Sequence, residues 1–296
     1  MCDSSRARAS IVVYCCGGSL ISDNNRRKIK MGHPDPIAFN IFDIDIRWYG
    51  ILIATGMMIA VLISCRRAAY HGIDEEDVLD TCIWMLPIGV IGARVYYVLF
   101  NLDYYKTLRS ALDIRAGGLA IHGGLIFGIA TVIIICRKKK IDPLNMLDLF
   151  MPSVALAQAI GRWGNFFNGE AHGGPTDLPW GILVDGVKVH PTFLYESIWC
   201  LLLFFALSYF DKNMRTAHGQ TLSLYLIFYS LERFCVEALR TDSLMIGPFK
   251  QAQVISLCAI IAGIILYKYV TKNRPITGKV ETGKNADKET SLSSDE

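Results

Sequence analysis

The chain has 296 residues, 52% of them hydrophobic and only 19% charged, and its mean hydropathy is +0.33; because soluble domains are about one quarter charged, this composition argues against a soluble protein. The formal net charge of +3 is too small to indicate a nucleic-acid partner. The nine cysteines form no C-x-x-C pair and no Cys/His spacing suited to zinc, so we predict neither a disulfide framework nor a metal site.

Residues 1–30 differ from the rest of the chain. They end in a basic cluster of Arg26, Arg27, Lys28 and Lys30, directly before Met31. The apolar stretch 11–16 is too short for the core of a signal peptide. We predict that this extension is disordered or not translated, and that Met31 is the true start of the functional protein.

Seven apolar runs follow, and most are near the roughly 20 residues that a helix needs to cross the hydrocarbon core of a bilayer. The fourth run is short and carries Asp148, Pro152 and Gln158, so it is the weakest of the seven. The runs cover approximately residues 48–65, 81–100, 117–136, 146–160, 192–210, 221–239 and 252–270.

Lys and Arg in the short loops indicate the orientation of such a chain, because they are retained on the cytoplasmic side. Clusters follow the first, third, fifth and seventh runs, and they share one face if the chain crosses seven times. These clusters contain Arg66, Arg67, Arg137, Lys138, Lys139, Lys140, Lys212, Arg215, Lys268, Lys272 and Arg274. We therefore predict an all-α polytopic membrane protein with seven transmembrane helices, its N-terminus outside and its C-terminus cytoplasmic.

The expected membrane domain covers residues 31–271. Between the fourth and fifth spans, residues 163–191 contain Pro175, Pro179, Trp180 and several glycines, which predicts a small outward-facing cap. Residues 272–296 are polar and rich in Lys, Glu, Ser and Thr, a composition typical of a disordered tail.

Residues 161–173 read G-R-W-G-N-F-F-N-G-E-A-H-G and place polar side chains at the end of the fourth run. Arg162, Asn165 and Asn168 are spaced i, i+3, i+6, so a helix would align them in one stripe. A guanidinium with carboxamide donors suits a phosphate oxygen. The alternative is a glycine-rich connecting loop whose polar residues face water.

The sixth run ends in three charges, Arg233, Glu237 and Arg240, spaced i, i+4, i+7 on one helix face. A charge at mid-membrane costs about 2.5–3.5 kcal/mol, while a Leu or Phe returns only about 0.3–0.6 kcal/mol. Such charges must pair or bind a ligand. Together with Arg162 they suggest an anionic headgroup site; the alternative is an internal Arg–Glu–Arg pairing that only locks helices together.

His122 lies in the third run and is followed by two glycines. A neutral imidazole can act as a general base near neutral pH, and the glycines let another backbone or a ligand approach closely. The alternative is a histidine that is hydrogen-bonded between two helices.

These segments together resemble the bacterial prolipoprotein diacylglyceryl transferases, over residues 39–269. Residues 161–173 are similar to the family signature G-R-x-G-N-F-x-N-x-E-x-x-G at every fixed position. Further similarities, in chain order, are W-Y-G at 48–50, H-G-G at 122–124, H-P-x-x-L-Y-E at 190–196 and R-x-x-x-E at 233–237. One departure is Ala116, because the family often has an acidic residue before the following glycines.

The resemblance implies seven spans in the bacterial cytoplasmic (inner) membrane. It also implies a transferase that moves the diacylglyceryl group of phosphatidylglycerol to the thiol of the lipobox cysteine of a prolipoprotein signal peptide. A thioether forms and glycerol phosphate leaves, without a metal or organic cofactor, as the first step of lipoprotein maturation. The residues carried over are Tyr49, His122, Arg162, Asn165, Asn168, Glu170, Gly173, Arg233 and Glu237.

We assign roles from the chemistry that this reaction requires. His122 is the expected base for the thiol, and Tyr49 is expected to orient the headgroup. Arg162 and Arg233, helped by Asn165, are expected to hold the departing phosphate.

The two glutamates of these segments have supporting roles. Glu237 is expected to position an arginine, and Glu170 either does the same or shapes the cap. An arginine clamp could also ionise the thiol by its positive potential, without a base. The alternative function is a membrane lipid-binding or transport protein with an anionic headgroup site, although a transporter usually shows internal repeats and we find none.

Overall fold

The computed structural model describes residues 34–41, 44–102, 105, 107, 111–113, 117–184, 186–241, 243 and 245–276. The predicted extension 1–30, Ala116 and residues 277–296 of the predicted tail lie outside this part of the chain.

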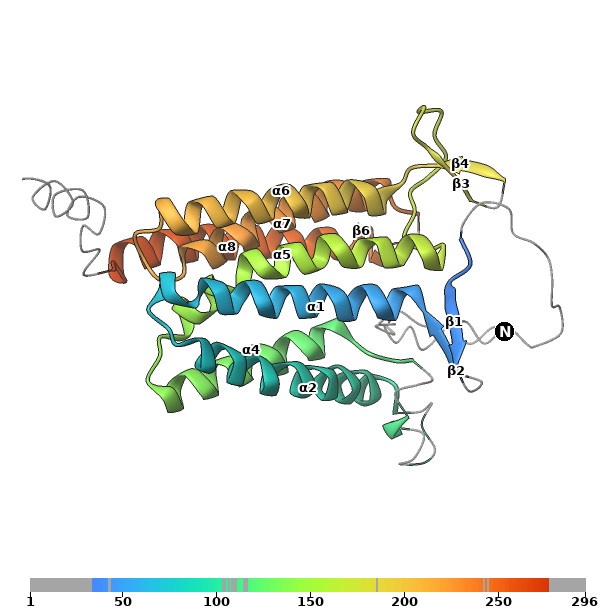
Figure 1. Ribbon diagram of the computed structural model, residues 1–296. Coiled ribbons are helices and arrows are strands. Elements are labelled where there is room, and N and C mark those ends of the chain that lie inside the picture. The colour runs from blue at the N-terminus through green and yellow to red at the C-terminus, as the bar shows by residue number, and fades with distance from the viewer. Residues whose placement is uncertain are drawn as a thin grey trace, which may run out of the picture.

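Long helices lie side by side along one axis (Figure 1). Each predicted run overlaps one helix, and most helices extend beyond their runs at one end or both, whereas α4 begins four residues after the start of its run. In chain order these are α1 (Trp48–Arg67), α2 (Glu75–Phe100), α4 (Ile121–Lys139), α5 (Pro143–Asn168), α6 (Thr192–Asn213), α7 (Gln220–Leu239) and α8 (Gln251–Asn273), with a short 3-10 helix η1 (Ala68–His71) after α1. The main packing pairs are α1 with α5, α5 with α6, α2 with α4, and α7 with α8.

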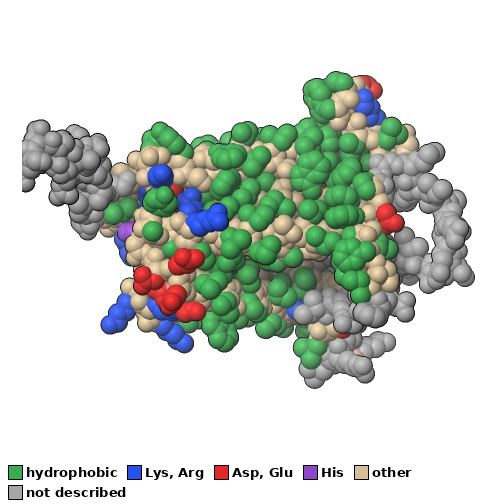
Figure 2. All heavy atoms as spheres, in the orientation of Figure 1, with side chains coloured by type: hydrophobic (Ala, Val, Ile, Leu, Met, Phe, Trp, Pro, Cys, Tyr) green, Lys and Arg blue, Asp and Glu red, His purple; other side chains and the backbone are tan. Residues whose placement is uncertain are grey.

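Six helices of the described chain are long and apolar enough to cross a membrane: α1 with η1, α2, α4, α5, α6 and α8. The space-filling view agrees, because apolar side chains cover the middle of the visible face (Figure 2). Helix α7 does not join the six, since Glu232, Arg233 and Glu237 lie within its 20 residues. The protein is therefore a mostly helical, multi-pass membrane protein.

The fourth run proves to be the central helix. In α5, 61% of the most apolar stretch is buried, against 17–33% in the other five candidate spans. The Asp142 side chain accepts a hydrogen bond from the Leu144 backbone N–H, and Pro143 occupies the first turn. The run looked short because a helix surrounded by other helices can carry polar residues that lipid would exclude.

Three small hairpins add strands that an all-α prediction omits. They are β1 (Ile37–Ile41) with β2 (Ile44–Arg47), β3 (Ile182–Val184) with β4 (Val187–Val189), and β5 (Met245–Ile246) with β6 (Phe249–Lys250). Only the middle one lies in the predicted cap. We call the end of the bundle where α5 ends and β3–β4 stands the hairpin end (Figure 1).

Residues 272–276, which the sequence assigns to the start of the tail, have defined contacts in the structure. Helix α8 continues to Asn273, and Pro275 pairs with Ala217 in a β-bridge. The Ile276 backbone N–H also donates to the Thr216 carbonyl at 2.9 Å. The first residues of the expected tail are thus bound to the α6–α7 loop.

The opposite end of the bundle is closed by a buried polar network, formed by Arg67, His71, Asn145, Asp148, Asp211 and Arg215. Asp211 contacts Arg67 at 2.6 Å and His71 at 2.8 Å. Asp148 accepts the backbone N–H groups of Gly219 and Leu222 at the start of α7. Arg215, one of the basic residues that the charge pattern assigns to a cytoplasmic loop, is only 5% exposed. The network joins α1, α5, α6 and α7.

We expect Asp211→Ala to lower the free energy of unfolding by about 3–5 kcal/mol, because Arg67 and His71 would stay buried without their shared partner. Unfolding of the purified protein in detergent measures this. Asp80→Ala is the matched control, since Asp80 pairs with Lys139 at the surface and surface pairs contribute little. Equal effects of the two changes would contradict the buried role of Asp211.

Candidate functional site

Two of the predicted arginines meet at a glutamate near the hairpin end. Glu196 of α6 is fully buried, and its Oε1 lies 2.7 Å from Nη1 of Arg233 on α7. Its Oε2 lies 3.4 Å from Nη1 of Arg162 on α5. One carboxylate therefore joins three helices and holds the two guanidinium groups together.

Glu196 was given no role in the sequence interpretation, although a signal for it was present. It is an ionisable residue just inside an apolar run, and it is the last residue of the H-P-x-x-L-Y-E segment. A single glutamate could not be assigned to either arginine, because helix packing decides which charges from separate spans meet.

Glu237 lies one turn above Arg233 on α7 and is 2% exposed. Its Oε2 contacts Nη2 of Arg233 at 2.7 Å. The contact matches the expected pairing of Glu237 with an arginine. The Lys250 ammonium donates to the backbone carbonyls of Glu237 and Arg240 at 2.6 and 2.8 Å, which satisfies the C-terminal end of α7.

Arg240 does not share the helix face of Arg233 and Glu237. Helix α7 ends at Leu239, and the Arg240 backbone is extended, with φ −75° and ψ 142°. Its backbone instead forms a β-bridge with Gly173. The i+7 spacing was read as helical, but the chain leaves the helix one residue earlier to join the segment that follows α5.

The polar stripe on α5 is helical as predicted, but its members have different partners. Arg162 donates to the Tyr229 hydroxyl at 3.2 Å, beside its contact with Glu196. The Asn165 and Asn168 amides donate to Oε1 of Glu170 at 3.3 and 3.1 Å. Glu170 thus faces the two asparagines rather than an arginine. This is possible because Gly169 has a positive φ of 65° and turns the chain back on the helix end.

Glycines of the signature segment, residues 161–173, allow neighbouring parts of the chain to pack closely against it. A Cβ atom at Gly164 would lie 2.6 Å from Cδ2 of Tyr49, so the Tyr49 ring lies directly on this part of α5. The neighbouring rings of Trp48 and Phe167 stack at 5.3 Å. These contacts place Tyr49, in the first turn of α1, against the side of α5 that faces α1, whereas Arg162 contacts Glu196 on α6 and Tyr229 on α7.

Gly173 occupies a crowded joint between three segments. Its N–H donates to the His190 carbonyl at 2.9 Å, and the next N–H, of Gly174, donates to the Leu239 carbonyl at 3.0 Å. A Cβ atom at Gly173 would lie 2.7 Å from Cβ of His190. Packing alone accounts for a glycine at this position, which the resemblance carries over as a functional residue.

We expect Gly164→Ala to reduce strongly the transferase activity that the resemblance implies, because the added methyl group must displace the Tyr49 ring from α5. Gly128→Ala is the control: its Cβ would lie 3.8 Å from the nearest neighbour, an ordinary contact, and alanine favours the helix. Activity of both purified variants, together with their thermal stability, tests this. Equal activity of the two would mean that the position of the Tyr49 ring is unimportant.

His122 lies apart from the arginines, in the first turn of α4. Its ring is 6.2 Å from that of Tyr96 on α2, centroid to centroid. Within the described chain, no hydrogen bond or ion pair joins it to Arg162 or Arg233. The structure therefore brings the two arginines and Glu237 together, but it does not place the imidazole in that cluster.

Arg94 is a second residue to which the sequence gave no role. Its guanidinium donates to the carbonyls of Ala111, Asp113 and Gly118 at 2.8, 2.8 and 2.9 Å, and also to Gly117. Gly118 has φ +80°, and a Cβ atom there would lie 2.6 Å from Nη1 of Arg94. Arg94 thus holds the segment that leads into α4 and its His122.

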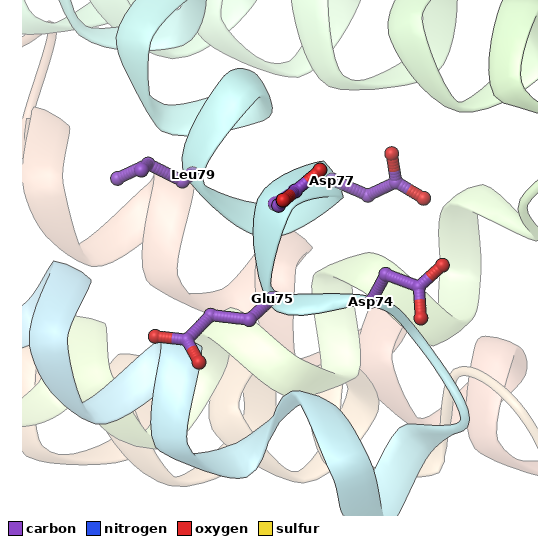
Figure 3. A pocket seen from close by; sticks show the side chains of 5 residues that line it. Asp74, Glu75, Asp77 and Leu79 are labelled. Atoms are coloured by element: carbon purple, nitrogen blue, oxygen red, sulfur yellow. The ribbon is translucent and has the colours of Figure 1, made fainter.

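A hollow lined by acidic residues, at the end of the bundle opposite the hairpin end, is not a candidate site because its side chains do not point toward one another. It is lined by Asp74, Glu75, Glu76, Asp77 and Leu79, and the Asp74 and Glu75 side chains point in different directions (Figure 3). Three of these carboxylates lie in the first turn of α2, where negative charge stabilises the helix dipole. Lys139 contacts Asp77 and Asp80.

Comparison with known proteins gives a consistent result. A family model described as "Prolipoprotein diacylglyceryl transferase" matches residues 36–269. The phosphatidylglycerol–prolipoprotein diacylglyceryl transferase of Finegoldia magna is 53% identical over 233 residues, which is 78% of this chain and 94% of the relative. The enzyme of that name from Clostridioides difficile is 54% identical over 239 residues, 80% of this chain and 96% of the relative. A Thermotoga petrophila relative of that name is 47% identical over 237 residues, 76% of this chain and 81% of the relative.

Proposed function

Because the chain belongs to the prolipoprotein diacylglyceryl transferase family, we propose that it transfers the diacylglyceryl group of phosphatidylglycerol to a cysteine thiol of a prolipoprotein. The observation that supports this most directly is the Glu196 carboxylate, which holds Arg162 and Arg233 together near the hairpin end. Two guanidinium groups so placed suit the phosphate of a lipid headgroup.

The site is proposed to face outward, with α7 as the seventh span. The basic residues at the ends of α1, α4 and α8 all lie opposite the hairpin end, which the positive-inside rule assigns to the cytoplasm. The charges of α7 do not argue against a span, because Arg233 is paired with Glu196 and Glu237 inside the protein. The N-terminus, the cap and the lipid headgroup then share the outer side of the bacterial inner membrane.

The arginines retain donors for a ligand. A guanidinium has five N–H donors, and the contacts with Glu196 and Glu237 use two of those on Arg233. The side chains of Arg162 and Arg233 remain 19% and 21% exposed, whereas Glu196 is fully buried. The carboxylates thus fix the guanidinium planes from within, and the remaining N–H groups are directed to a phosphate, helped by Asn165.

The remaining roles concern the acceptor. His122 is proposed to take the proton of the lipobox cysteine, and the signal peptide is proposed to lie between α4 and the arginine cluster. Tyr49 on α1 is proposed to orient the headgroup, since its ring lies on Gly164, two residues from Arg162 along α5. Sulfur attacks the glyceryl carbon, the carbon–oxygen bond to phosphate breaks, and glycerol phosphate leaves.

The buried polar network favours a transferase over the alternative of a transporter. It fastens α1, α5, α6 and α7 together at the end opposite the site. Alternating access requires a substrate path that opens at both ends. A chemical step on one side of the membrane needs only the hairpin end to be accessible.

A purified assay tests the proposal. The protein in detergent is supplied with phosphatidylglycerol and a peptide containing a lipobox cysteine, and the modified peptide and glycerol phosphate are measured together. We expect equal amounts of thioether peptide and glycerol phosphate. A peptide with serine in place of the cysteine is the control. Lipid binding without either product would favour the lipid-binding alternative.

A further inference from the structure

A third carboxyl group lies beside the arginine cluster without an interaction that accounts for it. Glu232 of α7 is only 5% exposed, and neither of its carboxyl oxygens has a hydrogen-bond partner. The residue directly precedes Arg233, and its charge acts on Arg162, Arg233 and Glu196. A buried polar group without a partner requires an explanation.

Side chains of α5 and α7 form hydrogen bonds at successive helical turns, and Glu232 lies at the next position of this series on α7. Gln158 pairs with Tyr225 at 3.0 Å, and Arg162 pairs with Tyr229 one turn further on. The two tyrosine rings stack at 5.4 Å. The next position on α7 is Glu232, about 4.5 Å beyond Tyr229 along the helix. Asn165, at the corresponding position on α5, donates to Glu170 instead, so Glu232 has no hydrogen-bond partner from α5.

The charges around Glu232 indicate which form the carboxyl takes. Arg162 of α5 and Arg233 of α7 are balanced by Glu196 and Glu237, and the Cys200 thiol of α6 and the Tyr229 hydroxyl also face this region. An ionised Glu232 would add an uncompensated negative charge beside Glu196. A protonated carboxyl avoids that repulsion and supplies an O–H donor.

We propose that Glu232 is the general acid of the transferase and gives its proton to the departing phosphate. This rests on the proposed function. The sulfur–carbon bond forms as the cysteine S–H proton passes to His122. The carbon–oxygen bond breaks and its electron pair stays on the phosphate, which takes the Glu232 proton and leaves as a singly charged glycerol phosphate. The proton held by His122 returns through water to the Glu232 carboxylate.

Proton transfer from Glu232 would limit the negative charge that develops on the leaving phosphate. The lipid phosphate carries one negative charge, and cleavage of the carbon–oxygen bond would raise it to two. Glu196 and Glu237 already neutralise both arginines, so the cluster has no spare positive charge for a dianion. Transfer of the Glu232 proton keeps the phosphate singly charged throughout the step.

Glu232→Gln tests the proposal, because glutamine keeps the size and a hydrogen-bond donor but has no acidic proton to transfer. We expect kcat to fall about 10²-fold, the range of one general acid, with little change in KM for phosphatidylglycerol. Wild-type kcat should decline at high pH, as Glu232 loses its proton, and the variant should lack that decline. Glu75→Gln, in the acidic hollow, is the control and should retain wild-type kcat.

Two further variants keep the outcomes distinct. Glu232→Asp retains a carboxyl, so it should recover part of kcat and the decline at high pH; it decides the matter if the glutamine variant does not fold. Glu232→Leu removes the donor as well as the proton, so its kcat should fall at least as far as that of Glu232→Gln. Wild-type kcat in Glu232→Gln, or an aspartate variant without the high-pH decline, would overturn the role of Glu232 while leaving the proposed function intact. If wild-type protein makes no thioether, the proposed function itself fails.

Discussion

Replacing Arg233 with lysine is expected to lower kcat about 10²–10³-fold, the loss seen when one donor that stabilises a developing oxyanion is removed. Lysine keeps the positive charge but lacks the planar fork. Arg233 contacts Glu196 through Nη1 and Glu237 through Nη2 at the same time. A single ammonium cannot span both carboxylates and still face a phosphate.

The matched control is Arg137→Lys, in the last turn of α4 opposite the hairpin end. Thioether formation by both purified variants is compared with that of the wild type. The control should retain full activity, because a basic residue there needs only its charge. Near-normal turnover by Arg233→Lys would remove Arg233 from the phosphate site and leave it a purely structural role between α6 and α7.

Replacing His122 with glutamine is expected to lower transfer by about 10²–10⁴-fold, the contribution of a general base, while phosphatidylglycerol binding is unchanged. The structure places the imidazole and the phosphate-binding arginines on different helices. His122 contacts α2 through Tyr96, whereas the arginines lie on α5 and α7. Loss of the imidazole should therefore leave the phosphate site intact.

This experiment also distinguishes the two ways of ionising the thiol. If the positive potential of the arginines is sufficient, His122→Gln will modify prolipoprotein at the ordinary rate. The control is His218→Gln, on the α6–α7 loop at the opposite end, where burial lowers the pKa of the imidazole. That variant should transfer and bind lipid as the wild type does.

The helices were predictable from the sequence, because an apolar run of sufficient length leaves few alternatives to a helix. The fourth run shows the limit of this argument. Its Asp148 and Gln158 made it look weak, yet they are partners of Gly219 and Tyr225 inside the bundle. Hydropathy measures compatibility with lipid, and it underestimates a helix that is enclosed by protein.

The site was predictable in its residue types but not in its pairing. Arg162 and Arg233 were expected to meet and they do, but the group that joins them is Glu196. The sequence predicts that Glu170 either positions an arginine or shapes the cap, whereas in the structure it accepts hydrogen bonds from Asn165 and Asn168. The helical interpretation of Arg240 was wrong because periodicity does not reveal where a helix stops. Contacts between separate spans depend on packing, which one sequence does not encode in its local pattern.

The residues of the proposed reaction centre come from two separate groups of packed helices. His122 belongs to the tightly joined pair α2 and α4, where Gly123 allows the helix backbones to touch. Arg162 and Arg233 belong to α5 and α7, which the network around Asp211 and Asp148 holds in one block. The distance between the imidazole and the guanidinium groups therefore depends on how these two groups of helices pack against each other, and no single helix determines it.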